Sequence, residues 1–186
     1  GNETYAFPEL QALPMAGTYV TSIEVTSPSD TVVKTGTLQM SVSSILPEAA
    51  DDKTYTWSVE NGTGEATIDA DGLLTATKAG TVVVKATAGD GGGAVDSKEI
   101  TITPVLVSSI TVTSASDTVV ETGTLQMGAT VLPDDADNTN VTWSVENGTG
   151  EATIDAGGLL TAVEIGTVVV KATAQDGSGT MGQKSI

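Results

Sequence analysis

Apolar and polar residues alternate along most of the chain, which is typical of half-buried β-strands. Ile23 and Val25, for example, alternate with Glu24 and Thr26, and residues 81–88 read TVVVKATA, the longest strand signal in the chain. Turns rich in glycine and asparagine separate such segments, and no stretch shows a helical period. The consecutive valines within 81–88 predict a central position in a sheet. The pattern therefore predicts an all-β protein built from short strands.

The same pattern occurs twice. Residues 56–70, TWSVENGTGEATIDA, recur without change at 142–156, so Trp57 and Trp143 lie 143 − 57 = 86 positions apart. An internal period of this length predicts two small domains and not one large domain. The expected divisions are a tether at 1–17, a first domain at 18–103 and a second domain at 104–186.

The two copies differ in length at two places. Residues 41–47 read SVSSILP, one residue more than GATVLP at 128–133, and this predicts a bulge in one copy of that strand. The second copy ends at Ile186, the counterpart of Ile100, so its last strand lacks counterparts of residues 101–103. We therefore expect the last strand of the second domain to be shortened here, and either the parent protein continues beyond Ile186 or the sequence was cut close to the end of the domain.

Residues 1–17 match nothing in the second copy. They contain Pro8 and Pro14, which disfavour a regular element, and they are interpreted as a tether. The alternative is that Tyr5, Phe7 and Leu10 dock on the first domain. The chain begins at Gly1 with no hydrophobic signal region before the first domain, which we interpret as an export signal already removed.

Each copy is expected to fold as an antiparallel β-sandwich, because about seven short strands fall within roughly 85 residues, with turn signals at regular intervals. A tryptophan in the third strand is typical of an immunoglobulin-like core. Trp57 lies two positions after Tyr55, and Trp143 lies two positions after Val141. Each pair therefore shares one face of its strand, which predicts that both indoles face the core. The alternative is an exposed platform on which a sugar ring stacks. The expected fold class is two tandem immunoglobulin-like β-sandwich domains.

Composition excludes several kinds of function. The net charge is −17, and the seven basic residues form no cluster that could displace counterions from phosphates, so nucleic-acid binding is not expected. With no histidine and no cysteine, the chain lacks an imidazole base, a thiolate nucleophile and nitrogen or sulfur ligands for zinc. No apolar run approaches the ~20 residues needed to cross a bilayer. The remaining enzymatic alternative is catalysis by paired carboxylates. We expect instead that the protein is not an enzyme. We also expect it to be monomeric.

Acidic loops are the candidate metal site. In an immunoglobulin-like sandwich, the loops after the second, fourth and sixth strands gather at the end where the chain enters. Converging carboxylates suit Ca²⁺, a cation that takes six to eight oxygen ligands. The alternative interpretation is solvated loops on an acidic protein. The candidates in the second domain are Asp134, Asp135, Asp137, Asp155 and Asp176, and those in the first are Glu48, Asp51, Asp52, Asp69, Asp71 and Asp90.

Several motifs together resemble the bacterial immunoglobulin-like domain, group 2. They are I-x-V in the first strand (Ile23 and Val25), T-W-S in the third, A-T-I-D-x-x-G-L-L-T-A, and G-T-V-V-V-K-A-T-A, each present in both copies in this or closely similar form. The resemblance covers almost all of both domains. It implies a bacterial surface or secreted protein in which such domains act as stalks or adhesive units. It carries no catalytic residues.

The expected function is a structural or adhesive segment of an exported bacterial protein, located at the cell surface or outside the cell. Its partner is expected to be a protein or glycan at a cell surface, and no cofactor other than calcium is suggested. The alternatives are a carbohydrate-binding pair attached to a secreted hydrolase, and a decoration on the surface of a phage tail.

Overall fold

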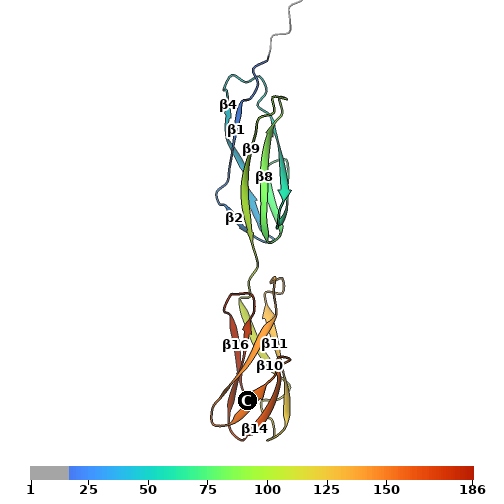
Figure 1. Cartoon of the computed structure of the whole chain (residues 1–186), viewed down its shortest axis with the longest axis vertical. Coiled ribbons are helices and arrows are strands. Elements are labelled where there is room, and N and C mark those ends of the chain that lie inside the picture. The colour runs from blue at the N-terminus through green and yellow to red at the C-terminus, as the bar shows by residue number, and fades with distance from the viewer. Residues whose placement is uncertain (1–16) are drawn as a thin grey trace, which may run out of the picture. The chain divides into compact units, whose positions relative to one another are not determined.

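A computed structural model describes residues 17–186. The predicted tether therefore lies, apart from its last residue, outside the described residues. The chain divides into two compact units, the first ending at Ile102 and the second spanning Thr103–Ile186. Every regular element within residues 17–186 is a β-strand, which confirms the all-β, immunoglobulin-like fold class (Figure 1). Accordingly, no helix of the described part is long and apolar enough to cross a membrane.

Strands β1–β9 build the first domain. One sheet has the order β2-β9-β8-β5, a second has the order β3-β7-β6, and β1 pairs with β4. The long valine-rich strand β8 lies inside its sheet, as predicted. The strands are β1 (Ser22–Thr26), β2 (Thr31–Val33), β3 (Thr37–Gln39), β4 (Ser41–Leu46), β5 (Tyr55–Asn61), β6 (Glu65–Ile68), β7 (Leu73–Lys78), β8 (Gly80–Ala88) and β9 (Val95–Thr103).

Strands β10–β16 build the second domain in two sheets, β10-β11-β14-β13 and β12-β15-β16. The counterpart of β8, β15, again lies between two neighbours. The strands are β10 (Ser109–Ser114), β11 (Thr124–Leu132), β12 (Val141–Asn147), β13 (Glu151–Ile154), β14 (Leu159–Glu164), β15 (Val168–Ala174) and β16 (Met181–Ser185).

The extra residue of the first copy produces the predicted bulge. Glu24 pairs with Ser44 but Val25 pairs with Val42, so Ser43 is left over in the β1–β4 ladder. In the second domain β10 and β11 pair without interruption. β11 is one continuous strand, whereas its counterpart is broken into β3 and β4 at Met40. A one-residue difference in the sequence therefore changes the local sheet structure.

A second local difference lies where the first strand meets the last. In the first domain the Asp96 carboxylate accepts a hydrogen bond from the Val25 amide at 2.8 Å. The counterpart of Asp96 is Gly182, where an added Cβ would lie 2.3 Å from the Ile110 carbonyl oxygen. Glycine is required there because the backbone of β10 approaches β16 too closely for a side chain.

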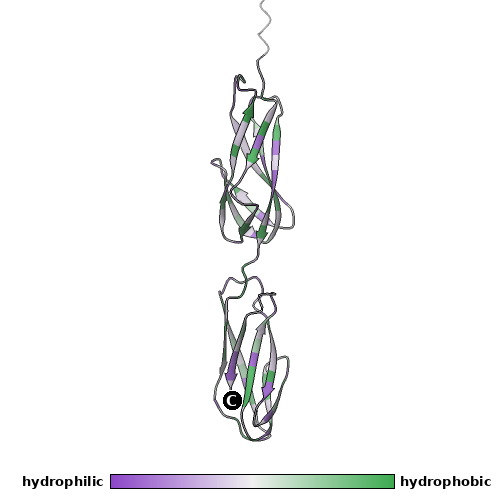
Figure 2. Cartoon of the chain, turned by 90° about the vertical axis from the view of Figure 1, so that its left-hand side faces the viewer, coloured by the Kyte–Doolittle hydropathy of each residue, from purple (hydrophilic) through white to green (hydrophobic). Residues whose placement is uncertain are grey.

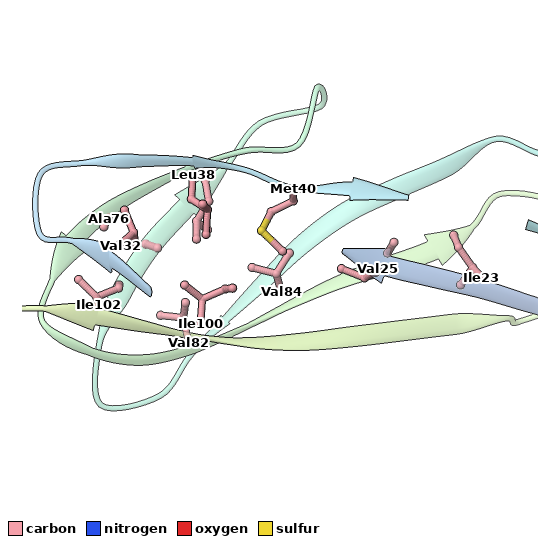
Figure 3. Close-up of a cluster of buried hydrophobic side chains, with 13 residues drawn as sticks. Ile23, Val25, Val32, Leu38, Met40, Ala76, Val82, Val84, Ile100 and Ile102 are labelled. Atoms are coloured by element: carbon pink, nitrogen blue, oxygen red, sulfur yellow. The ribbon is translucent and has the colours of Figure 1, made fainter. Parts of the chain in front are cut away.

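Apolar side chains from facing strands fill the interior of each domain. In the first, Leu38 and Met40 point toward Val82, Val84 and Ile100, as Figure 3 shows. Val82, Val84 and Ile100 are fully buried because alternate residues of β8 and β9 face inward. Along the strands of both domains, apolar and polar residues alternate (Figure 2). The second core is equivalent, with Leu160, Val170 and Ala172 fully buried.

Candidate functional site

Two carboxylates hold the segment by which the chain enters the first domain. The Asp51 carboxylate accepts a hydrogen bond from the Thr18 amide at 2.7 Å, and the Asp51 amide donates to the Thr18 carbonyl oxygen at 3.0 Å. From the glycine-rich loop after β8, the Asp90 carboxylate accepts from the Val20 amide. We call this arrangement the carboxylate clasp. It supplies acceptors to amides that no neighbouring strand satisfies.

The second domain repeats the carboxylate clasp at the predicted metal candidates Asp137 and Asp176. The Asp137 carboxylate accepts from the Val105 amide at 2.7 Å, and the Asp176 carboxylate accepts from the Val107 amide at 2.5 Å. The other oxygen of Asp176 accepts from the Ser178 amide at 2.9 Å. Hydrogen bonding with Ser178, and then with Val107, lowers the pKa of Asp176 because both favour the charged form.

A third candidate, Asp155, organises the turn before β14. Its carboxylate accepts hydrogen bonds from the amides of Gly157 at 2.8 Å and Leu159 at 2.9 Å. Gly158 in this turn has a φ of 81°, which a residue with a side chain rarely adopts. Asp69 makes the same two bonds in the first domain, to Asp71 and Leu73. Asp69 and Asp155 therefore stabilise these turns by accepting hydrogen bonds from backbone amides, a role for which the aspartate side chain is suited.

The structure does not gather the acidic candidates into a metal-binding group. Asp134 and Asp135 lie exposed beyond the end of β11. Within residues 17–186, no three acidic side chains are placed so that together they could hold an ion. In the first domain Asp52 accepts from the Thr54 amide at 2.8 Å, and this bond lowers the pKa of Asp52. Calcium binding stays a prediction, which melting curves in calcium and then in chelator can test.

Both tryptophans are half-buried and pack against their cores. Tyr55 meets Trp57 edge to face, with ring centroids 5.7 Å apart and planes at 88°. The edge of each indole lies against the turn glycine, since an added Cβ on Gly72 or Gly158 would fall 2.8 or 2.9 Å from the Nε1 atom. The indoles therefore pack against the cores. Part of each indole remains exposed to solvent, which the alternation of apolar and polar residues did not predict.

The charged groups of the described part lie at the surface of the two domains. No polar or charged side chain within residues 17–186 is buried. Lys171 contacts Glu146 at 2.5 Å, and this hydrogen bond and charge lower the pKa of Glu146. Every resolved shift of a carboxyl pKa in this part is downward. The hydrogen bonds that lower these pKa values favour the charged carboxylates.

A cavity that the sequence did not predict lies in the second domain. Its volume is about 130 Å³, and it opens between the turn that precedes β15 and the strands β13 and β14. Leu160, Ala162, Val168 and Ile186 form its apolar wall. Three glutamates, Glu121, Glu151 and Glu164, also line it. Its lining residues are distant from one another in the sequence, so no local pattern marked it.

Comparison with known proteins identifies the fold family. Residues 19–98 and 106–184 each match the family described as bacterial Ig-like domain (group 2). The tail tube protein pb6 of Escherichia phage T5 is 48% identical over 84 residues, which cover 43% of this chain. An uncharacterised protein of Clostridium acetobutylicum is 40% identical over 74 residues, or 40% of this chain. These regions span 18% and 8% of the two relatives' own lengths.

Solved structures of similar architecture include adhesins. A C-terminal fragment of intimin, solved in complex with the intimin-binding domain of the translocated intimin receptor, is 18% identical. It matches 91% of this chain and 64% of the fragment, with a TM-score of 0.34. The Escherichia coli adhesin FdeC is 16% identical and matches 88% of this chain and 63% of its own, with a TM-score of 0.43.

Proposed function

Because the chain belongs to the bacterial Ig-like domain (group 2) family, we propose that it is a structural and adhesive segment, without enzymatic activity, of a protein exposed at a bacterial cell surface or secreted. One observation carries the proposal. The candidate acidic side chains that form the carboxylate clasp and the turns accept hydrogen bonds from the backbone of their own domain. These carboxylates therefore stabilise the fold of their own domain.

The surface charge supports the same role. A net charge of −17 keeps the protein soluble and repels nucleic acids and anionic lipids. Lysine side chains on the strands pair with acids in the loops, as Lys98 does with Asp30 at 2.7 Å and Lys184 with Asp117 at 2.7 Å. Such exposed pairs contribute little to stability each, and they leave a polar exterior suited to an exported spacer. The partner is a protein or a glycan at a cell surface.

A second candidate function is the decoration of a virion. The observation that favours it is the 48% identity to part of the tail tube protein pb6 of a phage. The matched region is 84 residues long, about the length of one domain of this chain. A domain of this type added to a tail protein would be displayed on the outside of the particle, where it would meet the same kinds of surface partner.

Immunogold labelling distinguishes the two settings. Antibodies raised against the folded chain would be applied to intact, unpermeabilised cells of the source organism and to phage particles released from them. Gold on the outer cell surface or in the secreted fraction supports the first function, and gold on phage tails supports the second. Labelling that appears only after the cells are permeabilised rejects both. A glycan array with the same chain tests the carbohydrate-binding alternative, for which the exposed part of Trp57 or Trp143 would supply the stacking surface.

A further inference from the structure

An asparagine followed by a glycine opens the turn between β5 and β6, and the same pair opens the turn between β12 and β13. The pairs are Asn61-Gly62 and Asn147-Gly148. In a hairpin turn such a pair ordinarily supplies two residues with positive φ. The residues of this protein with positive φ include neither member of either pair. Other contacts of the two turns therefore explain why asparagine and glycine stand there.

In the first domain both members of the pair are hydrogen-bonded. The Asn61 side-chain oxygen accepts a hydrogen bond from the Ala66 amide at 2.9 Å. The Gly62 amide donates to the Thr81 carbonyl oxygen at 3.1 Å, and the Gly64 amide donates to the same oxygen at 3.1 Å. The second domain repeats these contacts, with bonds of 3.1 to 3.2 Å, at Asn147, Ala152, Gly148, Gly150 and Thr167.

The pair also carries a chemical weakness. Glycine has no side chain to hinder its amide nitrogen, so this nitrogen can attack the preceding asparagine side chain. The Gly62 nitrogen loses its proton to hydroxide and bonds to Cγ of Asn61, the Cγ–Nδ2 bond breaks, and ammonia leaves with a proton taken from water. Water then opens the five-membered imide at one of its two carbonyl carbons. The product is aspartate or isoaspartate.

The closed turn opposes this reaction. Ring closure requires Asn61 to rotate about its Cα–C bond, which takes it out of its pairing with Val82. The rotation also breaks the bond from Ala66, and the Gly62 proton is held by the Thr81 oxygen. Asn61 and Gly62 are both exposed, so water and hydroxide reach them. The hydrogen bonds of the turn, and not burial, therefore protect the amide.

The isoaspartyl product does not fit the closed turn. Isoaspartate carries the main chain through the Cβ and Cγ atoms of residue 61, which lengthens the turn by one methylene group. The turn has no room for an added atom, since a Cβ on Gly64 would lie 2.7 Å from the Gly80 carbonyl carbon. A Cβ on Gly62 would lie 2.8 Å from the Thr81 carbonyl oxygen. The lengthened turn therefore cannot restore the contacts of both glycines.

We propose that Asn61 and Asn147 are modification sites gated by the fold. Each side-chain amide persists while its turn is closed and is converted when the turn opens, and the isoaspartyl form then keeps the turn open. The two sites thereby record the opening of the ends of β5 and β12. A loosely held exposed loop would instead convert at the rate of a short peptide, whether or not its domain is folded.

Mass spectrometry of the complete chain in mildly alkaline buffer tests the proposal. Replacement of the side-chain nitrogen by oxygen would be followed at Asn61 and Asn147 in the folded chain, in the chain unfolded by urea, and in the blocked peptide Glu-Asn-Gly-Thr with and without urea. We expect the folded chain to convert at least about tenfold more slowly than the unfolded chain and the peptide. That factor corresponds to an opening free energy of about 1.4 kcal/mol.

Matched variants loosen one turn without changing the reacting pair. The Thr63 hydroxyl accepts a hydrogen bond from the Thr81 amide at 3.0 Å, and Thr149 makes the equivalent bond in the second domain at 3.1 Å. Thr63→Ala should speed conversion at Asn61 by about two- to tenfold, the factor for one lost hydrogen bond, and leave Asn147 unchanged. Thr149→Ala should do the reverse. Thr63→Ser retains the hydroxyl and should match the unmodified chain, and in urea all variants should convert alike.

Hydrogen exchange tests the effect of the product on the turn. Chains converted in urea would be refolded and the isoaspartyl form at position 61 isolated, with Asn61→Asp as the control that keeps the turn length. The isoaspartyl form should lose protection at the amides of Gly64 and Thr81, whereas Asn61→Asp should retain it. The proposal is overturned if the folded chain converts as fast as the peptide, if Thr63→Ala leaves Asn61 unaffected or speeds both sites equally, or if the isoaspartyl form keeps its protection.

Discussion

Removing one buried leucine from each domain should reveal how differently the two cores are closed. Leu74 and Leu160 are counterparts, and both are 0% exposed. Truncation to alanine removes three carbons, which corresponds to about 2–3 kcal/mol of lost transfer free energy. A closed hole adds about 24 cal/mol per Å³ of cavity that remains. Leu74 belongs to one buried cluster with Ile102, which is 2% exposed, so we expect Leu74→Ala to cost about 4–5 kcal/mol of unfolding free energy.

Leu160→Ala should cost less, about 3 kcal/mol, because Leu160 already borders a cavity of about 130 Å³. A side chain beside an empty space lacks contact partners on that side, so its removal forfeits fewer contacts. Calorimetry and urea unfolding would record the transition of each domain in both variants. Each substitution should move only the transition of its own domain, because each buried leucine belongs to a separate cluster. A larger loss for Leu160→Ala, or a shift of both transitions by one substitution, would refute this reasoning.

Three further predictions concern single positions. Trp143→Ala should cost the second domain about 3 kcal/mol by urea unfolding, at the low end for a core aromatic because the indole is half-buried; a loss under about 1 kcal/mol would show that the indole is not part of the core. The pKa of Asp176 is lowered in the fold from its ordinary value of 3.8, so its contribution to stability is complete above that value and is lost as the pH falls below it. The melting temperature of the second domain should therefore fall more steeply below about pH 4 in the natural chain than in Asp176→Asn, and parallel profiles would contradict the role of the carboxylate clasp. Ala76→Leu should overpack a closed core and lower the free energy of unfolding of the first domain by about 1–3 kcal/mol. Ala162→Leu should leave that of the second domain almost unchanged, because the cavity can receive the added carbons. Equal losses of unfolding free energy would argue against a usable cavity.

The strand pattern was predictable from the sequence because a strand with one buried face has apolar and polar residues at alternate positions. The inward positions Ile23 and Val25, and the internal place of β8, follow from that pattern. The bulge at Ser43 was predictable for a similar reason, since one additional residue in one copy must be left over in the ladder. Features that depend on local order along the chain are thus accessible before the structure is known.

The roles of the acidic side chains depended on tertiary structure. Asp137 lies 32 residues from Val105, and Asp176 lies 69 residues from Val107, so no local pattern indicates their hydrogen bonds. The partial exposure of Trp143 arises because β12 is the outermost strand of its sheet, and the order of strands is not written in the alternation. The cavity was hidden for the same reason, since its walls come from four separate segments of the second domain.

Pulling single molecules from their two ends tests most directly the claim that the chain is a structural segment made of two separate domains. Each match to the family covers about 80 residues, at 19–98 and 106–184. Complete extension of such a segment releases about 260–290 Å of chain, less the folded length of the domain. We expect two separate force peaks, each followed by a gain in length of that size. One peak with about twice the gain, or extension without a peak, would contradict the account.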